Sequence, residues 1–151
     1  MIKTHEPEYP QLLLTNQLCF PFYAASMLIT RHYQPLLDEL GITYPQYLVL
    51  MVLWEKDNLT VGQISNELLL NTNTLTPLLK RMEKGGLISR TRSSKDERQV
   101  LIAITPIGWE LRIRAALIPQ QIMEKVNYPL SDAITLMKDI NKFLIALKKS
   151  K

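Results

Sequence analysis

The amino-acid sequence predicts a mainly α-helical fold with one small β-hairpin, and residues 60–105 contain the patterns that predict it. Thr60 and Gln63 have the spacing of a capping box, and the apolar residues after them recur at helical spacing. A second helical pattern follows a short polar turn and ends at Gly85 and Gly86, because glycine commonly ends a helix. Two helices joined by a tight turn form a helix-turn-helix, whose second helix can enter the major groove of DNA.

The two helical patterns are followed by a predicted hairpin. Residues 87–92 and 99–104 are β-prone runs, and residues 93–98 form a polar tip between them. A two-stranded hairpin directly after a helix-turn-helix is called a wing. The sequence therefore predicts a winged helix-turn-helix.

Positive charge is concentrated in the second helix and the hairpin. Residues 80–98 contain seven Lys or Arg and three Asp or Glu, a net charge of +4. The whole chain has 18 basic and 14 acidic residues and also carries +4, so the residues outside 80–98 have no net charge. Such a local positive field is what neutralisation of DNA phosphates requires.

Length and composition limit the other possibilities. The 151 residues, 46% of them hydrophobic and 21% charged, predict a single folded and soluble domain over residues 1–151. No apolar run approaches the roughly 20 residues of a membrane span, and no signal-peptide pattern is present, so we expect a cytoplasmic protein. One cysteine excludes an intrachain disulfide, and neither His5 nor His32 has a partner at ligand spacing. With no phosphate loop and no nucleophile triad either, we expect no metal, no cofactor and no enzyme.

The segment before the helix-turn-helix predicts a loose arm and a broken helix. Residues 1–10 show little periodicity, and Asn16 is expected to cap the first helix, with Cys19 in its first turn. An apolar stripe continues until a break near Pro35, and a short helical turn then ends at Gly41.

Further caps predict the remaining helices. Thr43 and Gln46 form a second capping box, and Thr105 with a following proline begins a helix after the wing. We expect a kink at Pro119 and a last helix capped by Ser131.

The terminal helices predict a dimer. The last helix has an apolar stripe, and a winged core needs fewer helices than this chain has, so a partner subunit is expected to cover the stripe. We therefore predict dimerisation helices at residues 11–42 and 105–149, and a DNA-binding core at residues 43–104. The residues of the stripe are Ile134, Met137, Ile140, Leu144 and Leu147.

The order of these elements resembles the MarR family of transcriptional regulators, and the residues resemble its organic-hydroperoxide-sensing repressors of the OhrR type. The similarity runs from about Asn16 through the wing and is weaker in the last two helices. It is carried by Asn16-Gln17-Leu18-Cys19-Phe20, Tyr33-Gln34-Pro35-Leu36-Leu37-Asp38, Ile42-Thr43-Tyr44-Pro45-Gln46-Tyr47, Thr74-Leu75-Thr76-Pro77-Leu78-Leu79-Lys80-Arg81-Met82-Glu83 and Lys95-Asp96-Glu97-Arg98.

The start of the recognition helix departs from the type. Residues 71–73 read Asn-Thr-Asn, where the type usually has Asp-Ser-Gly, so an operator sequence cannot be carried over. Local pattern alone favours a helix start at Thr76, whereas the resemblance implies a start near Asn71 with Pro77 in the second turn. We expect the earlier start, because the turn after Leu70 would otherwise be too long.

Cys19 has two interpretations. A lone cysteine between apolar neighbours is commonly an inert core thiol, but a thiol in the first turn of a helix lies near positive amide ends, which favour the reactive thiolate. The resemblance implies that Cys19 senses peroxide with Tyr33 and Tyr44. Tyr23, four residues later, shares the face of Cys19. Because Tyr33 is 14 residues from Cys19, about 21 Å along one helix, its contact is expected from the other subunit.

The predicted DNA contacts lie in the second helix and the wing. Thr72, Asn73, Thr74 and Thr76 are expected to face the major groove, with Lys80 and Arg81 nearer phosphates. At the wing, Arg98 is expected to bind the minor groove or its phosphates, held by Asp96, with Arg92 and Lys95 also on the DNA side.

The resulting prediction is a homodimeric repressor that binds a double-stranded operator and is released when organic hydroperoxides oxidise Cys19. No second cysteine exists to resolve the sulfenic acid, so a small thiol, a sulfenamide or over-oxidation would complete the reaction. Two alternatives remain open. One is a MarR-type repressor released by aromatic or phenolic ligands, with Cys19 silent. The other is a one-cysteine peroxidase, although the chain lacks the catalytic Arg/Thr setting.

Overall fold

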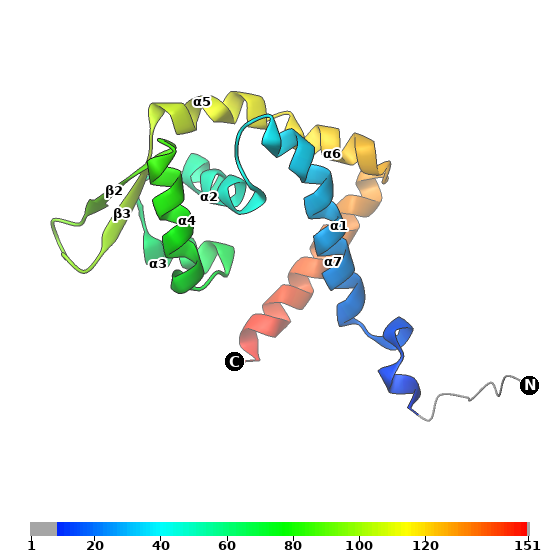
Figure 1. Ribbon diagram of the computed structural model, residues 1–151. Helices are drawn as coiled ribbons and strands as arrows, with labels where there is room; N and C mark the ends of the chain where they lie inside the picture. The colour runs from blue at the N-terminus through cyan, green and yellow to red at the C-terminus, as the bar shows by residue number, and fades with distance from the viewer. Residues whose placement is uncertain (1–8, 151) are drawn as a thin grey trace, which may run out of the picture.

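The computed structural model describes residues 9–150, so His5 and most of the predicted arm at residues 1–10 lie outside the described residues (Figure 1). The chain forms, in order, the short 3₁₀ helices η1 (Pro10–Leu12) and η2 (Leu14–Asn16), then α1 (Cys19–Asp38), α2 (Tyr44–Glu55), β1 (Leu59–Thr60), α3 (Val61–Leu68), α4 (Thr72–Lys84), β2 (Ile88–Arg92), β3 (Val100–Ile104), α5 (Pro106–Ala115), α6 (Ile118–Val126) and α7 (Leu130–Lys149).

The helices and strands gather at two ends of the molecule. Figure 1 shows α2, α3, α4 and the β2–β3 hairpin at one end, and α1, α6 and α7 at the other, with α5 running between them. The predicted fold class, mainly α with a winged helix-turn-helix, is confirmed.

The sheet has one strand that the sequence pattern did not predict. Strand β1 pairs with β3, so the antiparallel order is β1-β3-β2. Leu59 lies opposite Ile102, and Ile88 lies opposite Ile104. Two residues are too few to show an alternating pattern, and β1 exists only because β3 is beside it.

The helix-turn-helix begins and ends where the sequence predicts. Thr60 accepts a hydrogen bond from the amide of Gln63 at 3.1 Å, and the side chain of Gln63 accepts one from the amide of Thr60 at 2.8 Å, so the predicted capping box is formed. Helix α4 begins at Thr72, with Pro77 in its second turn, as the resemblance implies. A start at Thr76 is wrong. Asn71 occupies the cap position of α4, but its side chain makes no capping hydrogen bond.

The first helix corrects two expectations. Asn16 does not cap it: α1 begins at Cys19, and the Asn16 side chain donates a hydrogen bond to the carbonyl of Pro10 at 2.8 Å, closing the preceding 3₁₀ segment. The helix also continues through Pro35. A proline removes one amide donor, and the burial of Leu37 against the core holds the last turn in place.

The C-terminal helices correct two further expectations from the sequence. The chain is interrupted between α5 and α6, rather than kinked within one helix, because the ring of Pro119 is incompatible with a helical carbonyl at Ala115. Ser131 does not cap α7. Pro129 holds the cap position, and the Ser131 hydroxyl lies 3.1 Å from a carboxylate oxygen of Asp132.

The capping predictions for α5 and α2 are confirmed. The Thr105 hydroxyl accepts a hydrogen bond from the amide of Gly108 at 3.1 Å, so α5 is capped as predicted. The capping box predicted at α2 is also present, and in it the Thr43 amide donates to the Gln46 side chain at 2.8 Å.

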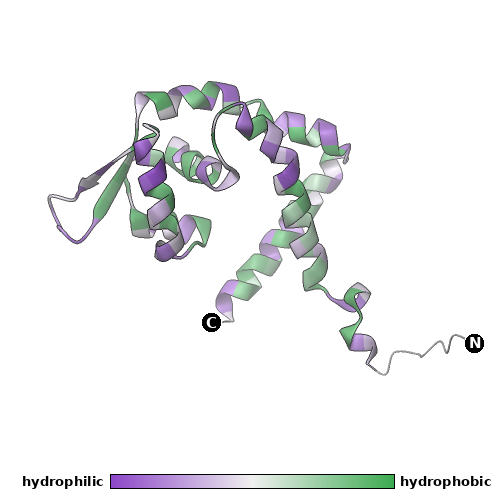
Figure 2. Ribbon diagram, viewed as in Figure 1, coloured by the Kyte–Doolittle hydropathy of each residue, from purple (hydrophilic) through white to green (hydrophobic). Residues whose placement is uncertain are grey.

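The core joins the winged part to the C-terminal half of α1. Leu37, Leu50, Ile64, Leu79 and Met82 are all fully buried. In contrast, no residue of α7 is buried, and Leu37 is the one buried residue of α1. Figure 2 shows hydrophobic residues along both helices. Within residues 9–150, no helix is long and apolar enough to cross a membrane.

Candidate DNA-binding surface and redox site

Helix α4 has one buried face and one accessible face. Its apolar side chains, which recur at helical spacing, anchor it in the core, and the polar residues between them stay at the surface. The buried residues are Leu75, Leu78, Leu79 and Met82. Thr72, Asn73, Thr74, Lys80 and Arg81 are exposed and Thr76 is half-buried. The predicted base-reading and phosphate-binding residues therefore share the accessible side of one helix.

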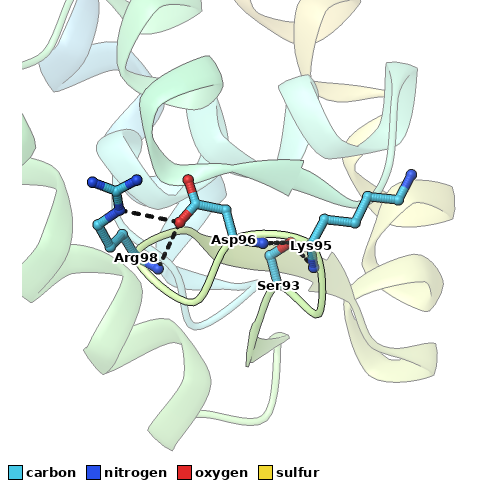
Figure 3. A network of polar contacts seen from close by, with 4 residues as sticks. All are labelled: Ser93, Lys95, Asp96 and Arg98. Carbon is cyan, nitrogen blue, oxygen red and sulfur yellow. Dashed lines mark hydrogen bonds and ion pairs between the residues drawn. The ribbon is translucent and has the colours of Figure 1, made fainter.

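The wing tip is ordered by its own side chains (Figure 3). The Ser93 hydroxyl accepts hydrogen bonds from the amides of Lys95 and Asp96 at 3.2 and 3.4 Å. One carboxylate oxygen of Asp96 accepts from the Arg98 amide at 3.1 Å and from Arg98 Nε at 3.3 Å. The Arg98 side chain is nevertheless 92% exposed. Asp96 thus orients the guanidinium without covering it, as predicted. Ser93 was not predicted, although a serine at the start of a turn commonly accepts a hydrogen bond from the amide two residues later.

Arg90 is a second residue that the sequence analysis did not single out. It lies in β2, and its Nη1 is 3.4 Å from a carboxylate oxygen of Glu83 in α4. Alternation along β2 puts Arg90 on the same side as the buried Ile88, and this alternation was the available signal. Arg92 and Lys95 are exposed at the end of the hairpin.

Cys19 is exposed and is the first residue of α1. Tyr23, one turn later, is 62% exposed. Tyr33 is on the same uninterrupted helix, 14 residues from Cys19, which corresponds to about 21 Å. Cys19 and Tyr33 of one chain are therefore too far apart to form a hydrogen bond.

Tyr33 meets two tyrosines of α2 instead. Its ring lies 5.0 Å from that of Tyr44 and 6.0 Å from that of Tyr47. Burial raises the pKa of the Tyr33 phenol, and the neighbouring Tyr44 raises it further. Burial also raises the pKa of Tyr44. Both phenols therefore remain protonated near neutral pH and can donate hydrogen bonds.

The aromatic cluster reaches the base of the wing through Trp54. The rings of Tyr47 and Trp54 are 6.2 Å apart, and Trp54 Nε1 donates to the carbonyl of Gly108 at 3.0 Å. Gly108 is closely packed, since an added Cβ would clash with the carbonyl oxygen of Leu87. This contact connects the tyrosines to the point where α5 meets the strands.

The sequence is similar to known transcriptional regulators. The family model described as "Transcriptional regulator SarA/Rot" matches residues 31–112. The organic hydroperoxide resistance transcriptional regulator of Bacillus subtilis is 52% identical over 118 residues, which cover 78% of this chain and 80% of that protein. The regulator SarZ of Staphylococcus aureus is 34% identical over 131 residues, covering 87% of this chain and 88% of that protein.

The fold is similar to solved regulators. Reduced AbfR bound to DNA is 36% identical, with a TM-score of 0.75 over 89% of this chain and 94% of that chain. The apo form of MarR from E. coli shares the fold at 23% identity, with a TM-score of 0.70 over 85% of this chain and 97% of that chain. These relatives are transcriptional regulators rather than enzymes. The chain belongs to the MarR family of winged-helix transcriptional regulators, together with the SarA/Rot regulators and the organic hydroperoxide resistance regulator of Bacillus subtilis.

Proposed function

We propose that this protein is a DNA-binding transcriptional repressor that organic hydroperoxides release from its operator by oxidising Cys19. The observation that carries the proposal is an exposed, single cysteine at the start of α1 in a chain 52% identical to an organic hydroperoxide resistance regulator. The relative AbfR has been solved reduced on DNA and in a disulfide form, which supports cysteine chemistry in this family.

DNA binding is the role of residues 43–104 in this proposal. The exposed polar face of α4 reads the major groove, and Arg98, oriented by Asp96, contacts the minor groove or its phosphates. Residues 11–42 and 105–149 form a homodimer, which sets two recognition helices on the two half-sites of an operator. The uncovered apolar faces of α1 and α7 support this arrangement.

The sensing site is completed by the partner subunit. Tyr33 and Tyr44 of one protomer donate hydrogen bonds to Cys19 of the other, because the length of α1 separates Cys19 from Tyr33 within one chain. Their raised pKa keeps both phenols protonated as donors. Tyr23 lines the same site from the turn after Cys19.

Oxidation then proceeds in two steps. The Cys19 thiolate attacks the outer oxygen of the hydroperoxide, the O–O bond breaks, and the sulfur becomes a sulfenic acid. The rest of the peroxide leaves as an alkoxide, which takes a proton from water and becomes an alcohol. A small cellular thiol next attacks the sulfenic sulfur and releases water, which leaves a mixed disulfide. Over-oxidised AbfR has been solved on DNA, so the bulk of a mixed disulfide is the better cause of release. That bulk displaces the start of α1 and changes the spacing of the recognition helices.

The direct test is a gel shift with DNA from upstream of the protein's own gene. Reduced protein should retard this DNA, and protein treated with an organic hydroperoxide and a small thiol should not. Release by a phenolic ligand but not by peroxide would favour the ligand-binding alternative. Sustained peroxide consumption with a thiol donor would favour a peroxidase.

A further inference from the structure

Beside the wing lies a cleft of about 350 Å³, and Arg90 and Gly62, which line it, are not among the predicted DNA contacts. We call it the phosphate notch. It opens where the start of α3, the second turn of α4 and the tip side of the β2–β3 hairpin meet. Its lining residues are Thr60, Val61, Gly62, Thr76, Arg90, Arg98, Gln99 and Val100. The lining includes two arginines, two hydroxyls and one amide, and no carboxylate, so its chemistry suits an oxyanion.

Arg90 supplies the cation at the inner side of the notch. Its side chain is 19% exposed, and Nη1 is held at 3.4 Å from Glu83. The Nε atom is buried, and no acceptor for it exists among the described residues. A guanidinium has five N–H donors and Glu83 accepts from Nη1 alone, so an oxyanion in the notch can accept from another donor of Arg90 without displacing Glu83.

Gly62 provides space in the notch for a bound oxyanion. It is the second residue of α3, it does not have a positive φ, and an added Cβ would meet only the Thr60 hydroxyl oxygen, at 3.9 Å. Nothing within the protein therefore requires glycine here, although alanine is the better helix former. A glycine that backbone and packing do not explain marks a place where another molecule approaches closely.

We propose that the notch binds one phosphate of the operator backbone, with Arg90 as its ligand and Gly62 as the residue that admits it. The proposal rests on the DNA-binding function proposed above. The duplex is the source because Thr76 and Arg98, which line the notch, belong to the two elements that meet DNA. A phosphate held there would fix the distance between α4 in the major groove and the wing beside it.

Two substitutions test the notch from opposite sides. Gly62→Ala should weaken operator binding about three- to tenfold and reduce the salt slope of log K by about one unit, while the melting temperature stays level or rises. Arg90→Gln should reduce the slope by the same amount. Because both changes remove the same phosphate contact, the double variant should bind DNA little worse than the weaker-binding of the two single variants. Arg112→Gln on α5 removes an equal charge away from the notch and should leave binding unchanged.

A second test changes the DNA instead of the protein. Replacing single phosphates by neutral methylphosphonates should identify one position that weakens the wild type but not Gly62→Ala. If Gly62→Ala binds the operator with wild-type affinity and salt slope, the notch is empty in the complex and the proposal fails. It also fails if inorganic phosphate binds the notch of the free protein while no methylphosphonate has an effect. A wild type that does not bind its upstream DNA would instead overturn the proposed function itself.

Discussion

The rings of Tyr33 and Tyr44 pack edge to face, with centroids 5.0 Å apart and an interplanar angle of 64°. Tyr33 belongs to α1, and Tyr44 is the first residue of α2. The pair therefore joins a proposed dimerisation helix to the proposed DNA-binding core.

Removing either hydroxyl should slow sensing and leave the fold intact. Tyr33→Phe and Tyr44→Phe keep the ring contact but lose the hydrogen-bond donor to the thiolate. The activation free energy for oxidation of Cys19 should therefore rise by about 1.5 kcal/mol, which slows the reaction roughly tenfold. The rate is measured by thiol titration at a fixed hydroperoxide dose. Tyr128→Phe, at an exposed tyrosine between α6 and α7, is the matched control. Wild-type rates for both variants would remove the tyrosines from the sensing site.

Cys19 should be the one residue that peroxide modifies to release DNA. Cys19→Ser is nearly isosteric and lies far along the chain from α4, so operator affinity should stay close to wild type. Organic hydroperoxide should no longer release the DNA. Dimedone should label oxidised wild type at Cys19 and should not label the variant. If the variant leaves DNA at the same dose as wild type, the redox mechanism is wrong and a phenolic ligand becomes the better inducer.

Arg98 should contribute one ionic contact. Arg98→Ala should weaken binding to every DNA sequence and reduce the salt slope by about one unit. Asp96→Ala should weaken binding less, because Arg98 keeps its charge and loses only its orienting carboxylate. Fluorescence anisotropy at several salt concentrations measures both the DNA affinity and its salt slope. An unchanged slope for Arg98→Ala would show that the wing does not touch DNA.

The apolar faces of α1 and α7 should form the dimer interface. Met137 in α7 is 57% exposed in the single chain, and Met137→Glu should place a charge in the interface. Sedimentation should give a dimer for wild type and for Lys138→Glu, and a monomer or an unfolded chain for Met137→Glu. A folded wild-type monomer at micromolar concentration would exclude this interface and, with it, the intersubunit contact of Cys19 with Tyr33.

The aromatic cluster predicts how stability changes at high pH. Burial, followed by the neighbouring Tyr33 and Tyr44, raises the pKa of Tyr47 above 10.0. The folded protein therefore holds these phenol protons more tightly than the unfolded chain. This contribution is complete below pH 10.0 and is lost as the pH rises through the folded-state values. Chemical denaturation should show a steeper loss of stability above pH 10.0 for wild type than for Tyr47→Phe. Parallel curves would contradict the burial of the phenol.

Much of the fold follows from local sequence. The capping box of Thr60 and Gln63, the cap at Thr105 and the stop at Gly85 involve residues within four positions of each other, so neighbouring letters determine them. The Asp96–Arg98 contact is equally local. The winged helix-turn-helix could therefore be predicted, and so could the order of buried and accessible residues on α4.

Tertiary packing decided the features that local pattern misjudged. The sequence predicts a helix break near Pro35, but the burial of Leu37 holds the turn, and β1 is a strand only because β3 pairs with it. In the sequence Arg90 is one of seven basic residues between positions 80 and 98, and only the position of β2 brings it next to Glu83 and into the same cleft as Gly62. Each of these depends on contacts between segments distant in sequence. The free energy of such contacts comes from apolar burial and strand pairing across the core, and no short window of residues contains both partners.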